Sequence, residues 1–188
     1  MSILLTTTAM LSQMNTALAD SQAVVFVGNN WDGTVNVFNS QNYSKVGVIN
    51  VVPDKQARMK EILLNPIKLV AFQAVRNLIG EGHDQLVDDM YSSNDGKLLI
   101  ASRPSFADVV AIDIATGKIV WRFVVDGYRS DHMALSPDGT KVAVSASTGN
   151  VVHILDVNTG KQVGKFASGN SPHENVYSKD GSKIYHAS

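Results

Sequence analysis

Cysteine is absent from this chain of 188 residues. Disulfide bonds, zinc sites built on thiolates and thiol nucleophiles are therefore excluded. The chain also lacks a surplus of either charge, since 16 Lys and Arg stand against 17 Asp and Glu. It contains no basic run that would neutralise a row of phosphates, so we expect no nucleic acid partner.

A long uninterrupted apolar run is also missing. The stretch from Ile3 to Ala19 is largely apolar, but Thr, Ser, Gln and Asn interrupt it, so we expect no membrane span. Its apolar core and its Ala17-Leu18-Ala19 end are typical of a secretory signal, although the usual positive residues before the core are missing. We interpret residues 1–19 as a signal-like segment and predict a secreted or periplasmic protein. An ordinary N-terminus is the alternative.

The chain does contain a repeat of 42 to 43 residues. Asp-Gly recurs at this spacing at Asp95, Asp138 and Asp180, and Thr-Gly-Lys begins at Thr116 and again at Thr159. Short apolar runs lie between these turn residues. A period of this length, built from short strands, is the signature of a β-propeller, whose blades have four antiparallel strands. The sequence therefore predicts an all-β propeller.

The repeat accounts for about three and a half blades within a partial propeller over residues 20–188. We place blade 1 at about 23–52, blade 2 at about 83–125, blade 3 at about 131–167 and the start of blade 4 at 173–188. A closed ring needs about four to eight blades, so we predict part of a seven-bladed ring. An incomplete ring exposes one face of each terminal blade. We therefore expect the chain to form an oligomer or to be completed by the missing half of the propeller.

Residues 53–80 interrupt the repeat and predict a helical insert after blade 1. Asp54 is expected to cap a first helix, and Asn65-Pro66 fits the N-cap and first position of a second. The second helix carries one apolar stripe, which we expect to pack on the propeller. A partner or membrane face is the alternative. The stripe consists of Ile67, Val70, Ala71, Ala74, Val75 and Leu78.

Each repeat opens with a histidine, at His83, His132 and His173. These positions fall where the chain crosses from the outer strand of one blade to the inner strand of the next, at one mouth of the central channel. A single histidine there would be interpreted as structural. Three in register, with charged neighbours, indicate a polar site. His153 and His186 fall elsewhere in the repeat and are expected to be packing or surface residues.

Three imidazoles could bind a transition metal, but adjacent blades would spread them along an arc. We therefore predict neither a metal site nor a cofactor. The same groups suit acid–base chemistry on an acidic glycan. Arg129 and Arg103 could hold a carboxylate, and Tyr128 could exchange a proton beside the histidines. These parts match β-elimination beside a uronate, whereas no pair of carboxylates suited to hydrolysis stands out.

Several motifs resemble those of known propellers. The Ser-Pro-Asp-Gly turn at Ser136 and the Ile-Asp-x-x-Thr-Gly-Lys segment at Ile112 are similar to motifs of the YVTN and quinoprotein-amine-dehydrogenase-like propeller superfamily, over residues 86–188. More narrowly, six loops resemble those of seven-bladed propellers that include the rhamnosyl-glucuronate lyases acting on plant gums. These loops are Gly80 to Asp84, Ser102 to Ser105, Asp126 to His132, Ser145 to Thr148, Ser171 to Asn175 and Tyr185 to Ser188.

The narrower resemblance implies a lyase active site at the channel mouth. It does not assign which residue is the catalytic base and which is the catalytic acid. It implies catalytic roles for His83, Tyr128, Arg129, His132 and His173. The expected substrate-binding residues are Arg103, Asp84 and Glu174. The alternative is a non-catalytic propeller that binds a glycan or a protein as a scaffold. A quinoprotein redox role is disfavoured, because no haem motif or tryptophan-rich cofactor stack is present.

Overall fold

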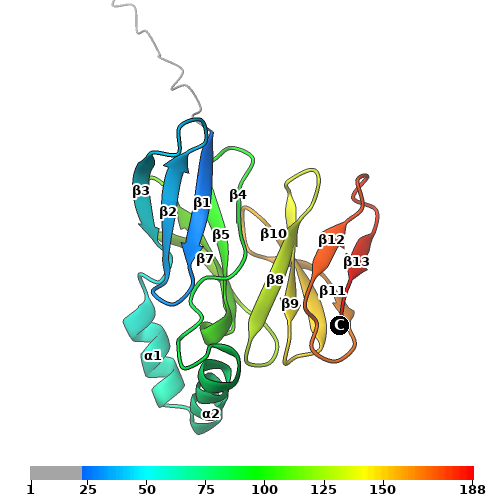
Figure 1. Ribbon diagram of the computed structural model, residues 1–188. Coiled ribbons are helices and arrows are strands. Elements are labelled where there is room, and N and C mark those ends of the chain that lie inside the picture. The colour runs from blue at the N-terminus through cyan, green and yellow to red at the C-terminus, as the bar shows by residue number, and fades with distance from the viewer. Residues whose placement is uncertain (1–22) are drawn as a thin grey trace, which may run out of the picture.

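The computed structural model describes residues 23–188, which form a set of antiparallel sheets (Figure 1). Within this range, thirteen strands build four sheets, one of three strands, two of four strands and one of two. In every sheet the strands keep their order along the chain, as in a propeller blade. The predicted partial propeller with a helical insert is confirmed. The signal-like segment 1–19 lies outside the described residues, and the count of seven blades stays a prediction.

Each sheet corresponds to one blade. Blade 1 contains β1 (Val24–Asn29), β2 (Thr34–Asn39) and β3 (Lys45–Asn50). Blade 2 contains β4 (Met90–Ser92), β5 (Leu98–Arg103), the short 3-10 turn η2 (Pro104–Phe106), β6 (Asp108–Asp113) and β7 (Ile119–Val124). Blade 3 contains β8 (Ser130–Leu135), β9 (Lys141–Ala146), β10 (Val151–Asp156) and β11 (Gln162–Ala167). Blade 4 contains β12 (Asn175–Tyr177) and β13 (Ile184–His186).

The repeat in the sequence arises from two turns that recur in successive blades. The first joins the two inner strands, and in blade 3 the Asp138 carboxylate accepts hydrogen bonds from the Thr140 amide and from the Ser136 hydroxyl. These hydrogen bonds lower the pKa of Asp138 to about 2. The second turn joins the two outer strands, where Asp156 accepts from the Thr159 amide at 2.8 Å. Local turn chemistry therefore fixes the hairpins of each blade.

The apolar core lies between neighbouring blades. Val35 and Ile49 of blade 1 pack against Leu99 and Ile112 of blade 2, and a second cluster joins blades 2 and 3. In that second cluster Trp121 donates its indole N–H to the Val157 carbonyl at 2.9 Å. Blade-to-blade packing therefore holds the arc together.

The outer face of blade 1 is exposed. The apolar run that forms β1 is not buried on both of its faces, because Val25 and Val27 are 40% and 44% exposed. At the opposite end of the arc, Val176 and Tyr185 of blade 4 are exposed as well.

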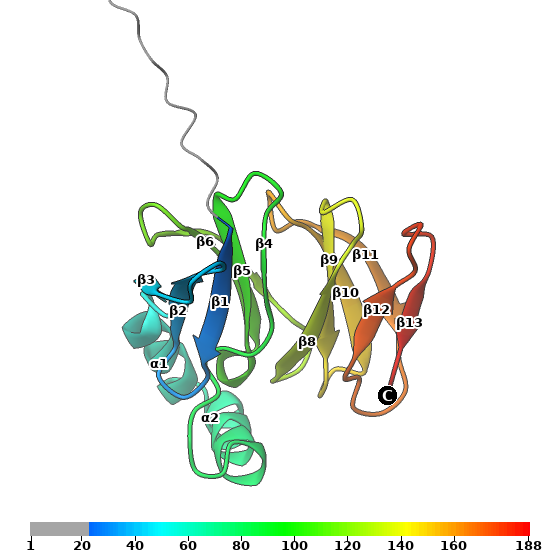
Figure 2. The same ribbon diagram turned by 45° about the horizontal axis from the view of Figure 1, so that its top comes forward.

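The insert contains α1 (Lys55–Leu63) and α2 (Pro66–Ala74), which a π-helical turn, η1 (Val75–Ile79), continues. Both helices lie at one end of the blades, away from the hairpin that joins β4 to β5 (Figure 2). The predicted cap of α2 is confirmed, because the Asn65 side chain accepts from the amides of Ile67 and Lys68. Asp54 does not cap α1 with its side chain and instead forms ion pairs with Arg58 and Arg103.

The predicted packing face of α2 was wrong. Ile67, Val70 and Leu78 of the apolar stripe are 64%, 70% and 83% exposed, whereas Phe72 and Val75 are buried. The Phe72 ring, which is not part of the stripe, joins a small core beneath the insert, and half of the six stripe residues face solvent. The π-helical turn adds a further rotation before Leu78. Among the described residues no single helix is long and apolar enough to cross a membrane. The two insert helices pass that test only together, and they are bent by 114°.

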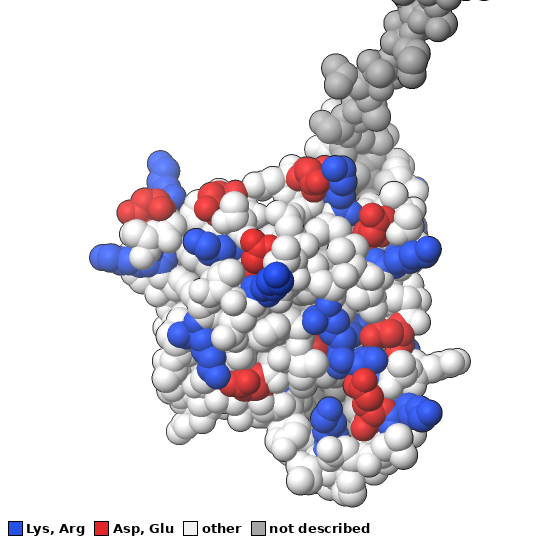
Figure 3. All heavy atoms as spheres, turned by 180° about the vertical axis from the view of Figure 1, so that it is seen from behind, with Lys and Arg blue, Asp and Glu red and all other residues white. Residues whose placement is uncertain are grey.

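The face opposite to that of Figure 1 carries both signs of charge. Figure 3 shows Lys and Arg interspersed with Asp and Glu across this face. No continuous basic area is visible on it. This distribution agrees with the charge balance of the whole sequence.

Candidate functional site

His132 and His173 meet where blades 3 and 4 adjoin. His132 lies in β8, and His173 lies in the crossing from β11 to β12, which packs against β8. Their ring centroids are 4.2 Å apart, with 35° between the ring planes. We had expected the blades to spread the histidines along an arc, and for this pair the expectation was wrong. The segment that leads from blade 3 into blade 4 places His173 against β8, the inner strand of blade 3.

Asn175 holds this crossing in place. Its buried side-chain amide donates to the Ser145 hydroxyl at 2.8 Å and to the His132 carbonyl at 3.4 Å. The His173 amide donates to the Ala187 carbonyl at 3.0 Å. The Asn175 bonds tie blade 4 to blade 3 beside the histidine pair, and the His173 bond holds the crossing against the end of blade 4.

Both ring nitrogens of His132 face carboxylates. Its Nδ1 lies 3.3 Å from Glu174 Oε2 and 3.7 Å from Asp89 Oδ2. Its Nε2 lies 3.9 Å from Asp131 Oδ1. Such neighbours can orient the ring and fix which nitrogen carries the proton.

A β-bulge in β8 sets the positions of Asp131 and His132. In the β8–β9 ladder Ser130 pairs with Ala146 and Met133 pairs with Val144, so the register shifts between them. Bulges commonly redirect side chains next to functional sites. Here the bulge leaves Asp131 buried at 2% exposure and His132 only partly exposed.

Arg129 pairs with Asp131 at the edge of this cluster. Its guanidinium donates to Asp131 Oδ2, to the Ser147 hydroxyl at 3.2 Å and to Gln85 Oε1 at 3.4 Å. Asp131 Oδ1 is buried, and within residues 23–188 it has no hydrogen-bond partner. Asp131 therefore presents an unsatisfied carboxylate oxygen toward His132.

Two carboxylates of the cluster were missed from the sequence. Asp88 and Asp89 directly precede β4, and Asp89 Oδ2 accepts from the Met133 amide at 2.8 Å. Burial raises the pKa of Asp88, and the negative charges of Asp131 and Asp89 add to this effect, although His132 and Arg129 oppose it. The paired acids at the entrance of an inner strand were a visible signal.

His83 and Asp84 do not join the cluster. His83 stacks on Trp31 with ring centroids 3.8 Å apart and an angle of 12° between the planes. Asp84 lies 3.3 Å from the Arg76 guanidinium of η1. The histidine of blade 2 is therefore held by the loop between β1 and β2, and its neighbour by the insert.

Arg103 is completely buried and is already paired. Its guanidinium contacts Asp108 at 2.7 Å and Asp54 at 2.6 Å, and it donates to the Val51 carbonyl at 3.1 Å. The expectation that Arg103 binds a substrate carboxylate is therefore corrected. It joins blade 2 to the start of the insert, and the side chain is 0% exposed.

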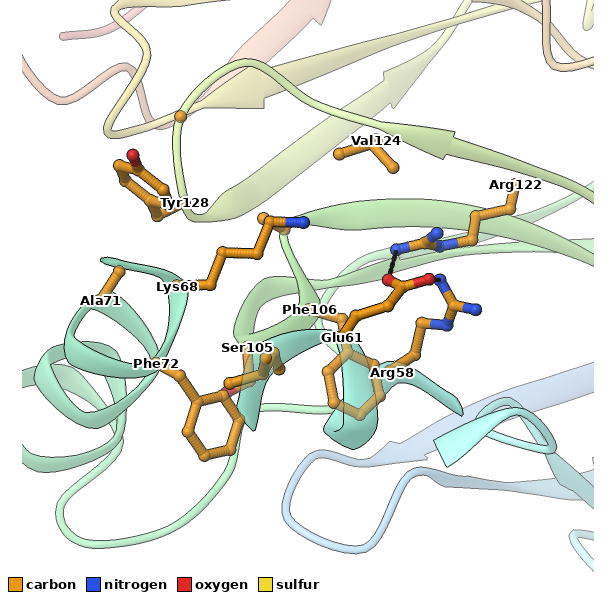
Figure 4. Close-up of a pocket in the computed structure, with 13 residues that line it drawn as sticks. Arg58, Glu61, Lys68, Ala71, Phe72, Ser105, Phe106, Arg122, Val124 and Tyr128 are labelled. Atoms are coloured by element: carbon orange, nitrogen blue, oxygen red, sulfur yellow. Dashed lines mark hydrogen bonds and ion pairs between the residues drawn. The ribbon is translucent and has the colours of Figure 1, made fainter. Parts of the chain in front are cut away.

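Tyr128 lies at a separate pocket between blade 2 and the insert. Figure 4 shows its ring beside Ala71 and Lys68 of α2. Also in the pocket lining, Glu61 forms ion pairs with Arg58 and Arg122. The pocket lining includes neither His132 nor His173. Of the five expected catalytic residues, the structure therefore gathers His132, His173 and Arg129, and leaves His83 and Tyr128 elsewhere.

Comparisons with known proteins bear on the fold. No protein-family profile matches the chain, and no curated protein sequence matches it. Among solved structures, a chain titled as the mitotic checkpoint complex is 13% identical with a TM-score of 0.59, covering 88% of this chain and 40% of that one. A hydrazine synthase of Kuenenia stuttgartiensis is 24% identical with a TM-score of 0.48, covering 54% of this chain and 29% of that one. The first likeness supports the propeller architecture, and this chain spans less than half of either matched chain.

Proposed function

We propose that the chain is part of a glycan-binding β-propeller, whose ligand is held by His132, His173 and Glu174. The observation that carries the proposal is the meeting of two imidazoles and a carboxylate at the junction of blades 3 and 4. Imidazole nitrogens and carboxylate oxygens together offer the donors and acceptors that sugar hydroxyls require. His173 and Glu174 are exposed, so a ligand can reach both side chains.

β-Elimination at a glucuronate carrying rhamnose is a narrower proposal for the same place. Its support is His132 with Glu174 beside Nδ1, which suits an imidazole that accepts a proton at Nε2. Elimination also needs a cation for the substrate carboxylate, but Arg129 is paired with Asp131 and Arg103 is buried. Tyr128 lies at the insert pocket. Glycan binding requires none of these displaced groups, so it is the primary proposal and elimination is the secondary one.

Export belongs to the proposal, because a secreted or periplasmic protein would meet extracellular glycans. Its support is the signal-like sequence of residues 1–19. Expression with these residues and mass measurement of the mature chain tests it. Loss of the segment on export is expected, and a full-length chain retained in the cytoplasm contradicts this part of the proposal.

The central test is calorimetric titration of the chain with a rhamnose-capped glucuronate polymer and with an uncharged plant polysaccharide. We expect binding of at least one glycan that His173→Ala abolishes and that His83→Gln, at the Trp31 stack, preserves. Ultraviolet absorbance of an unsaturated uronate, lost with His132→Gln, would establish elimination. Absence of binding to either polymer by folded protein would overturn the glycan proposal.

A further inference from the structure

We propose that Asp131, His132 and His173 form a binding site for a divalent transition metal ion. One ligand atom from each of these residues lies within 4.8 Å of the other two. Two of the residues come from the bulge in β8, and the third comes from the crossing into blade 4. The site therefore joins two blades. The proposal does not rest on glycan binding, because metal affinity is measurable without any glycan.

The environment of His132 selects the nitrogen that would bind the metal. Nδ1 faces Glu174 at 3.3 Å and Asp89 at 3.7 Å, and these carboxylates favour a proton on that nitrogen. The lone pair is then left on Nε2, which faces Asp131 Oδ1. Metal-binding histidines in proteins usually donate their other N–H to a carboxylate or carbonyl in this way.

Asp131 supplies an observation independent of the histidines. Its side chain is 3% exposed, and Oδ1 finds no hydrogen-bond partner in residues 23–188. A buried carboxylate oxygen without a partner is unfavourable. Arg129 holds the other oxygen, so the free oxygen points in a defined direction beside His132. A cation between Oδ1 and the two imidazoles would satisfy it.

The distances require a small closure. Zn²⁺ binds nitrogen and oxygen at about 2.0–2.2 Å, which places tetrahedral ligand atoms about 3.4 Å apart. The gap between Asp131 Oδ1 and His132 Nε2 is 3.9 Å. His173 is exposed and lies outside the regular strands, so its ring can rotate toward the other two ligand atoms.

The ligand set indicates the class of ion. Two imidazoles and one carboxylate suit Zn²⁺ and its transition-metal neighbours, whereas Ca²⁺ and Mg²⁺ prefer sites built from oxygen. Three protein ligands leave a fourth position of a tetrahedral ion for water or another ligand. Zn²⁺ is therefore the first ion to test, and Co²⁺ can report the geometry through its visible absorption.

The test is calorimetric titration of the chain with Zn²⁺ alone. We expect one ion per chain, and we expect His132→Gln and His173→Gln each to weaken binding by about tenfold or more. His83→Gln removes an imidazole that stacks on Trp31 outside the site, and it should leave the affinity unchanged. Far-ultraviolet circular dichroism of every variant checks that the fold is retained. Excess Ca²⁺ should not displace Zn²⁺.

Glu174 is assigned a positioning role, which a second pair of variants tests. Glu174→Ala removes the acceptor beside Nδ1 and should weaken Zn²⁺ binding by about 10- to 100-fold. Glu174→Gln keeps an acceptor oxygen and should restore most of the affinity. Co²⁺ should give the intense visible bands of tetrahedral coordination in the parent chain. No Zn²⁺ binding by folded protein, or binding that His132→Gln and His173→Gln leave intact, would overturn the proposal.

Discussion

Arg103 and Asp108 form a two-point ion pair in which neither side chain is exposed. Arg103 Nε lies 2.7 Å from Asp108 Oδ1, and Arg103 Nη2 lies 2.8 Å from Oδ2. The two residues are partners in the β5–β6 ladder, and Asp54 extends the pair to the insert. One buried guanidinium therefore fixes both a hairpin of blade 2 and the start of the insert.

Removal of one partner from this pair should be strongly destabilising. Asp108→Asn leaves the Arg103 charge buried without its main counter-ion, and we expect a loss of about 3–5 kcal/mol in the free energy of unfolding. Urea denaturation followed by circular dichroism measures this loss. Lys97→Met breaks only the exposed Lys97–Asp95 pair and should leave stability unchanged. Equal stabilities of the two variants would contradict the assigned role.

The burial of Arg103 could not be predicted from the sequence. Its place in a loop similar to that of a lyase suggested a substrate contact, but its burial depends on Asp54, which lies 49 residues away. The α2 stripe shows the same limit, because its spacing gives a helix but not the rotation imposed by Phe72 and η1. Long-range packing decides both cases, and no local pattern records it.

The propeller itself was predictable because its signals are local. The Asp-Gly and Thr-Gly-Lys turns, the short apolar strands and the Asn65-Pro66 cap each act within a few residues of the chain. The histidine pair was predictable only in part. The repeat placed His132 and His173 at equivalent positions, but the bulge in β8 and the crossing held by Asn175 bring them into contact.

Gly160 and Gly117 offer a matched test of packing between blades. They occupy the same turn in successive blades, with φ angles of 66° and 67°. A Cβ at Gly160 would lie 2.5 Å from the Trp121 ring, whereas a Cβ at Gly117 meets no atom of the described residues within 4 Å. Both alanine variants should lose about 1–2 kcal/mol from left-handed strain. Gly160→Ala should lose about 1–3 kcal/mol more, from the clash.

Thermal and urea unfolding of both glycine variants measures the difference. If Gly160→Ala and Gly117→Ala are equally stable, the Trp121 ring moves aside at no cost and the junction between blades 2 and 3 is looser than its contacts indicate. The shared backbone strain cancels in the comparison, so the difference reports the contact with Trp121 alone.

His153 should make stability depend on pH. It is 1% exposed, accepts from the Asp126 amide at 3.1 Å and contacts Gln162 Oε1 at 2.7 Å. Burial lowers the pKa of His153 below 6.5, although Gln162 and Asp126 act in the opposite direction. The folded state thus favours the neutral ring. The stabilising contribution is present above about pH 6.5 and is lost as pH falls through the lower folded pKa.

The measurement is the free energy of unfolding as a function of pH, for the parent chain and for His153→Gln. Each pH unit between the folded and unfolded pKa values corresponds to about 1.4 kcal/mol, so the parent profile should fall more steeply between neutral pH and pH 5. The other histidines are common to both proteins and cancel in the difference. Parallel profiles would contradict the burial effect.

The exposed end faces of the arc should drive self-association. Val25 and Val27 of β1 stand on the uncovered face of blade 1, and Val176 and Tyr185 are exposed on blade 4. Apolar patches of this kind are usually covered in the functional assembly, so light scattering of the chain at micromolar concentration should give a mass above the monomer.

Val27→Lys should shift the mass toward the monomer without loss of stability. Val120→Lys changes an equally exposed residue on β7, away from both end blades, and should leave the mass unchanged. A monomeric, cooperatively folding parent chain would show that this arc of blades is stable with its end faces uncovered.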